Sequence, residues 1–161
     1  MVDCPLCGTV DRFLSSSTTA VLGLLSKFIL HGLNETTCVG AEKMHQAVRL
    51  RNPPPSDRRP SRRRGLITVS NHVSAVDDPG VVAAMLPWPW LFDSQLLRWT
   101  PCATDRCFTN PVIAWFLRKG KVVPIERGGG LQHPFITDLV RALAIGEWIH
   151  MFPEGTRARL R

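Results

Sequence analysis

The sequence has no apolar run long enough to cross a membrane as a simple helix. Its most apolar segment, residues 13–33, is interrupted by Lys27 and His31, and its dense part is shorter than the roughly 20 apolar residues that a spanning helix needs. We therefore expect a helix in the membrane interface from residue 18 onward, with Lys27 extending its amine toward water. The alternative is a helix packed on the core of a soluble domain.

Cysteines are few and follow no disulfide pattern. There are five, an odd number at irregular spacing, and the first residues lack the basic start of a cleavable signal, so a disulfide-rich secreted scaffold is not expected. Cys4 and Cys7 form a CxxC pair, but no second pair completes a zinc site. We predict no structural metal and a reducing or organellar interior.

Basic side chains are scarce outside one segment. The net charge is +7, and residues 49–64 hold seven arginines against Asp57, so the rest of the chain is close to neutral. No nucleic-acid partner is predicted, because no aromatic platform accompanies these arginines. Three consecutive prolines, 53–55, favour a disordered loop whose arginines attract anionic lipid. RNA binding and nuclear import remain the alternatives for this loop alone.

A chain of 161 residues can bury one core, so one folded domain is expected. Composition divides the chain into a flexible N-terminus (1–17), a membrane-interfacial helical segment (18–48), an Arg/Pro-rich disordered loop (49–64) and a folded domain (65–161). Within the second part, residues 34–48 are expected to form a polar helix.

From residue 65 onward, short β-branched runs alternate with helical patterns. Strands are predicted at 66–70, 106–108, 121–125 and 147–152, and helices at 78–86, 110–120 and 133–146. Asp78 and Asn110 each precede a proline, as an N-cap precedes the first helical residue. This alternation predicts an α/β fold with a mainly parallel sheet flanked by helices.

A histidine and an aspartate stand where the first of these strands gives way to a helix. His72 lies just past the strand, where open α/β sheets place ligands. Asp77 follows five residues later, and a continuous helix would turn the two side chains about 140° apart, so a turn must bring them together. Asp77 can then orient His72 and stabilise the cation formed when His72 takes a proton. The alternative is an aspartate that only caps the helix.

Two further segments place polar groups at strand ends. In FPEGTR (152–157), Gly155 lets the backbone approach a ligand, Glu154 and Arg157 point into the loop, and the guanidinium suits phosphate. Arg127 follows another strand in GKVVPIERG. Two basic groups near one His–Asp pair indicate a site for a phosphorylated alcohol, whereas a surface turn with a salt bridge is the alternative.

The segments NHVSAVDDP, RWTPCATDRCFTN, GKVVPIERG and WIHMFPEGTR, in this order and at these intervals, resemble the glycerophosphate acyltransferase superfamily. Within it they are most similar to the phospholipid–lysophospholipid transacylases of cardiolipin remodelling, over residues 18–157. The resemblance implies that His72 is the general base on the free hydroxyl of a lysophospholipid and that Asp77 is its orienting partner. It also implies that the acceptor-binding region contains Arg127, Glu154 and Gly155.

The resemblance further implies phospholipid and lysophospholipid substrates, no metal and no coenzyme A cofactor, and a membrane-associated, mitochondrial location. Oligomeric state stays open. Arg157 stands where these transacylases usually carry lysine and matches acyl-CoA-dependent relatives instead, so an acyl-CoA-dependent lysophospholipid or lysophosphatidate acyltransferase is the alternative enzyme. Because the family continues with more strands and a fourth motif, we expect the sheet to be incomplete at Arg161. A catalytically inactive membrane-binding fragment is the non-enzymatic alternative.

Overall fold

The structure is a computed structural model that describes residues 12–51, 63–74, 77–128, 130 and 133–155. Its strands are β1 (Leu66–Val69), β2 (Thr100–Ala103), β3 (Val122–Ile125) and β4 (Trp148–Met151). The α-helices are α1 (Arg12–Lys27), α2 (Ala41–Arg51), α3 (Val82–Met85), α4 (Thr104–Cys107), α5 (Pro111–Lys119) and α6 (Pro134–Ala144). The shorter helical turns are η1 (Phe28–Gly32), η2 (Asp77–Val81), η3 (Trp88–Phe92) and η4 (Ser94–Leu96).

The four strands are parallel, as predicted. β1 pairs with β4, and β2 pairs with β3. A parallel bridge between Trp99 and Ile149 joins the two ladders, so the order across the described strands is β1-β4-β2-β3. Because the strands are parallel, their carboxyl ends meet at one edge of the sheet, which is the edge where ligands are expected.

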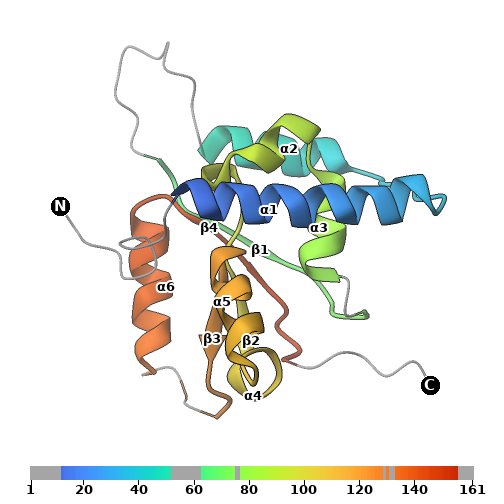
Figure 1. Ribbon diagram of the computed structural model, residues 1–161. Helices are drawn as coiled ribbons and strands as arrows, with labels where there is room; N and C mark the ends of the chain where they lie inside the picture. Colours follow the sequence, from blue (N-terminus) through green and yellow to red (C-terminus); the bar gives the residue numbers. More distant parts are fainter. Residues whose placement is uncertain (1–11, 52–62, 75–76, 129, 131–132, 156–161) are drawn as a thin grey trace.

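Helices cover both faces of this sheet. Figure 1 shows α1 lying across one end of the strands and α6 running alongside them. Adjacent side chains of β4 point to opposite faces of the sheet. Trp148 packs in a cluster with residues of α2 and α3, and Ile149 packs in a second cluster with residues of α6. Both side chains are buried, so β4 is an interior strand that fixes the position of the turn that follows it.

The Pro-led helices form as the sequence predicts. The Asn110 side chain accepts hydrogen bonds from two N–H groups of the first turn of α5, and the His133 side chain accepts one, from Phe135, at the start of α6. The predicted strand at 106–108 is wrong, because those residues belong to α4 and the turn after it, while the strand lies earlier, at Thr100–Ala103. A bridge between Cys102 and Cys107 ties this strand to α4, although the sequence analysis predicted no disulfide framework.

The N-terminal boundaries also need correction. α1 begins at Arg12, so residues 12–17 are helical and are not part of a flexible N-terminus. Lys27 does not extend toward water: it is 6% exposed, its Nζ donates to the Ala84 carbonyl at 2.8 Å, and burial lowers its pKa. The helix after it starts at Ala41 rather than near residue 34. Among the described residues, no helix combines the length and apolarity needed to cross a bilayer.

Arg51 was predicted to belong to the disordered arginine loop, but it ends α2 and is 2% exposed. Its guanidinium donates to the carbonyl oxygens of Gly146 and Gln95, which lie on segments far along the chain. Arg51 therefore clamps α2 to the domain and is not available to lipid. Residues 52–62, which carry most of the predicted loop, lie outside the described residues.

Candidate active site

His72 and Asp77 lie together beyond the carboxyl end of β1. The His72 Nδ1 atom is 3.0 Å from Asp77 Oδ2. The same carboxylate oxygen accepts the backbone N–H groups of Val73 and Ser74, both at 2.7 Å, so residues 72–74 fold around the Asp77 carboxylate. The sequence predicted that the two side chains meet, and they do so within one short segment.

Asp77 is held in its ionised form. Burial opposes ionisation, but the N–H of Ser74, the His72 ring and the N–H of Val73 outweigh it, and together they lower the pKa of Asp77. A charged carboxylate at Nδ1 keeps the ring hydrogen on that nitrogen, which leaves Nε2 on the other edge of the ring to accept a proton. The His72 side chain is 24% exposed, so a substrate can reach it.

The turn after β4 lies against this pair. The Phe152 ring stacks on the His72 ring with centroids 4.3 Å apart and planes 26° apart. Gly155, at φ +64°, has the left-handed conformation that lets the turn fold back, and among the described residues, its chain neighbours aside, no atom lies within 4 Å of where its Cβ would be. Glu154 in the same turn is exposed. The predicted FPEG motif and the His–Asp pair therefore lie side by side, in contact through Phe152.

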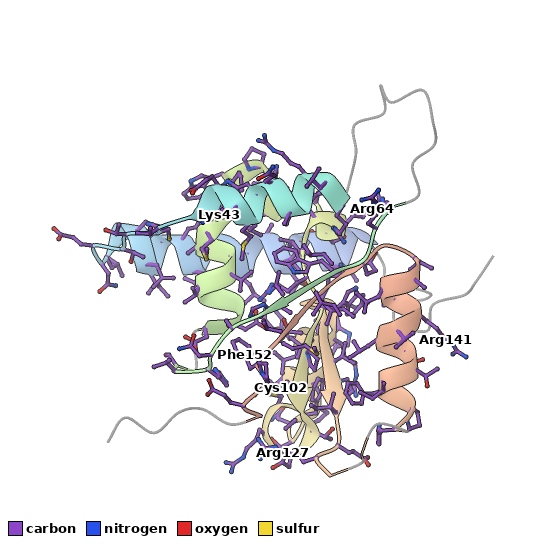
Figure 2. All side chains as sticks on the ribbon, turned by 180° about the vertical axis from the view of Figure 1, so that it is seen from behind. Lys43, Arg64, Cys102, Arg127, Arg141 and Phe152 are labelled. Atoms are coloured by element: carbon purple, nitrogen blue, oxygen red, sulfur yellow. A yellow bond between two sulfur atoms is a disulfide. The ribbon has the colours of Figure 1, made fainter. Side chains whose placement is uncertain are left out.

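Arg127 reaches the same turn from the end of β3. Its Nη2 donates to the Gly155 carbonyl at 3.4 Å, and its Nη1 lies 3.7 Å from the Asp105 carboxylate. Figure 2 shows the labelled Arg127 and Phe152 in the lower half of the molecule, away from α2. Both contacts of Arg127 are long and its side chain is 44% exposed, so the guanidinium can exchange them for an anion. Arg157 lies outside the described residues.

One buried ion pair beside the site was not anticipated by the sequence analysis. Asp78 has the extended backbone of an N-cap, but its carboxylate pairs with Arg98, which precedes β2. Arg98 is 5% exposed, and burial lowers its pKa to about 10. The pair ties the residue after Asp77 to the central part of the sheet. The only available sequence clue was a second aspartate directly after the first.

His150 is a second unanticipated group. It lies in β4 and is 2% exposed, and it hydrogen-bonds the side chains of Thr68 and Ser70 at 2.8 and 3.2 Å. Burial, and secondly the positive charge of Arg98, lower the pKa of His150 to about 4. The ring is therefore neutral at neutral pH.

This lowered pKa predicts acid sensitivity. Because an unfolded histidine titrates near pH 6.5, the unfolded chain binds more protons than the folded one between about pH 6.5 and 4. Stability should thus be full above pH 6.5 and fall as pH drops toward 4, by about 3 kcal/mol from this group. Urea unfolding at pH 7.5, 6 and 5 measures the decline. His150→Gln should flatten it over this range, and an unchanged slope would contradict the assignment.

An α/β domain with a His–Asp pair and a Pro-Glu-Gly turn at one sheet edge is the arrangement expected of an acyltransferase. The sequence profile of the family described as Acyltransferase matches residues 37–161, and the chain belongs to this family.

Several curated relatives support the resemblance that the sequence motifs indicated. The chain is similar to tafazzin of Drosophila melanogaster, at 35% identity over 144 residues, which are 88% of this chain and 35% of that protein. It is similar to taffazin of Dictyostelium discoideum, at 33% identity over 144 residues, 89% of this chain and 47% of that protein. A third relative is N-acylphosphatidylethanolamine synthase of Arabidopsis thaliana, at 43% identity over 93 residues, 56% of this chain and 31% of that protein.

The chain thus spans about a third to a half of the length of these relatives. No solved structure matches it.

Proposed function

We propose that this chain carries the catalytic centre of a membrane-associated phospholipid–lysophospholipid acyltransferase, with another phospholipid as acyl donor. The observation that carries the proposal is the His72 Nδ1 contact to Asp77, made beside the FPEG turn. Tafazzin-type relatives over most of the chain support the lipid substrates.

In this mechanism His72 acts as a general base. Its Nε2 takes the proton from the free glycerol hydroxyl of a lysophospholipid as the hydroxyl oxygen attacks the acyl carbonyl carbon of the donor. The tetrahedral intermediate collapses with cleavage of the donor ester bond. The leaving alkoxide takes the proton back from Nε2, so the donor departs as a lysophospholipid. Asp77 stabilises the imidazolium that exists between these two transfers.

Arg127 binds the acceptor phosphate. We expect Arg127→Ala to raise the KM for lysophospholipid about tenfold with little change in kcat, because a charge-assisted bond to a non-reacting group is lost. Arg106→Ala is the matched control, since Arg106 lies 3.6 Å from the same Asp105 carboxylate but is 73% exposed. Steady-state kinetics with detergent-dispersed lysophospholipid measure both variants, and equal KM values for the two would refute the role of Arg127.

Membrane contact is assigned to the outward face of α1 and its continuation. Val21, Leu25 and Phe28 are 60, 53 and 58% exposed, an apolar surface that suits the lipid interface. Of the predicted segment 18–48, α1 and η1 are proposed as this interfacial element, and a mitochondrial membrane is the proposed location. Trp88 of η3 is also 55% exposed, while Trp90 packs against the core.

The direct test of the function is the choice of acyl donor. The protein is incubated in liposomes with labelled lysophospholipid and phosphatidylcholine, with and without acyl-CoA. Labelled diacyl product without acyl-CoA supports the proposal, whereas product only with acyl-CoA rejects the transacylase and favours the alternative enzyme. A third arm supplies phosphatidylethanolamine as an amine acceptor, because one relative is an N-acylphosphatidylethanolamine synthase. If N-acylated product forms in that arm and no product forms in the others, the acceptor in the mechanism is an amine and not a hydroxyl.

A further inference from the structure

The buried histidine of β4, His150, has no part in the mechanism above. We propose that His150 is a positioning residue of the acyl-transfer site, which holds the His72 ring in the orientation in which Asp77 keeps the ring hydrogen on Nδ1 and Nε2 is left for the substrate hydroxyl. The inference rests on the proposed function, in which His72 is the base. It is carried by a series of hydrogen bonds and a ring stack that both end at His72.

The hydrogen bonds through His150 have one consistent direction. Trp148 Nε1–H can only donate, and it donates to Thr68 Oγ1 at 2.8 Å. At the other end of the series the Ser70 hydroxyl donates to the Asn71 carbonyl oxygen at 3.2 Å, because that carbonyl can only accept. With its one hydrogen used there, Ser70 Oγ accepts the hydrogen of His150 Nε2, 3.2 Å away. The neutral ring then has no hydrogen on Nδ1, which accepts from the Thr68 hydroxyl at 2.8 Å.

This series ends at the peptide unit that carries His72. The Asn71 carbonyl and the His72 nitrogen share one planar peptide group, so a fixed carbonyl restricts where the His72 side chain can lie. Each hydroxyl in the series donates one hydrogen bond and accepts another, so the series is continuous from Trp148 to Asn71.

A second route runs through the aromatic rings. The His150 and Phe152 rings meet in an edge-to-face arrangement, with centroids 4.8 Å apart and planes at 90°. Phe152 in turn stacks on His72 at 4.3 Å. His150 thus supports the ring that covers one face of the base, and edge-to-face contacts of this kind have a preferred geometry that a non-aromatic side chain lacks.

His150 does not contact substrate in this arrangement. It is 2% exposed, and both ring nitrogens have partners within the domain. Its influence on the reaction therefore passes through His72, which separates it from a second general base.

The test compares His150→Phe, which keeps an aromatic ring but removes both hydrogen bonds, with His150→Gln, whose amide can restore the donor to Ser70. For His150→Phe we expect kcat to fall at least tenfold with KM for lysophospholipid nearly unchanged, and His150→Gln should recover part of the loss. Side-chain ¹⁵N NMR of His72 provides a readout independent of turnover. The wild type should show mainly the Nδ1–H tautomer, and His150→Phe a mixture of both tautomers.

Ser70→Ala provides the same test at an exposed position, where folding is not at risk, by cutting the last link to Asn71. His133→Phe is the control, because His133 caps α6 and lies outside this series. Folded Ser70→Ala and His150→Phe proteins with wild-type kcat and an unchanged His72 spectrum would overturn the inference. If the wild type transfers no acyl group, the proposed function fails, whereas the His72 spectra still decide whether His150 positions that ring.

Discussion

Replacing His72 with alanine should reduce acyl transfer about a thousandfold or more while the protein still binds vesicles. The expected loss reflects removal of the proton acceptor, since a positioned general base contributes about 10²–10⁴-fold, and the Asp77 carboxylate is then left without a ring to orient. The proposed lipid-facing side chains of α1 lie elsewhere, so binding should not change.

His133→Ala is a close control for this prediction. The His133 side chain is 23% exposed and lies 3.5 Å from the Glu126 carboxylate, so it matches His72 in exposure and in having an acidic neighbour. Initial rates in liposomes and vesicle flotation measure the two properties separately. Transfer that survives in His72→Ala at a rate near that of His133→Ala would remove His72 from the mechanism.

Replacing Arg98 with methionine should lower the free energy of unfolding by about 3–5 kcal/mol, because it leaves the buried Asp78 carboxylate without its partner. The double variant Arg98→Met with Asp78→Leu should recover most of this loss, since neither side chain then requires charge compensation. The substitution should also slow acyl transfer, because Arg98 anchors Asp78, the residue next to Asp77.

Arg141→Met is the matched control for the ion pair. Arg141 lies 3.6 Å from Asp138 on the outside of α6 and is 52% exposed, so its loss should cost less than about 1 kcal/mol. Urea unfolding at pH 7 compares all variants. If Arg98→Met costs no more than Arg141→Met, then the buried pair does not stabilise the fold as described.

Most of the secondary structure was predictable because its causes are local. The Asn110 cap with its following proline, and the β-branched runs of β1 and β3, specify their elements within a few residues. β2 was misplaced because Pro101 is a poor strand former. Its pairing with β3 and its bridge to β4 decide its conformation, and these are contacts between distant segments.

The placement of the N-terminal helix α1 could not be predicted from the sequence alone either. Apolar content alone left the interfacial and the core-packed helix open, and α1 has features of both. One face packs on the domain through buried Ser15, Thr19 and Ala20, while Val21 and Leu25 stay exposed. The position of Lys27, whose amine is satisfied by a carbonyl of α3, depends on a contact 57 residues away.

The sequence by itself determined the motifs of the site and their order along a parallel sheet. The interval from His72 to Asp77 was enough to require a turn, because both residues belong to one short segment. Only the tertiary structure decided what surrounds that turn: Asp78 pairs with Arg98, and His150 approaches Ser70 across 80 positions of the chain. Such contacts arise when packing brings distant side chains into a space without water, where charges and hydrogen-bonding groups must find partners.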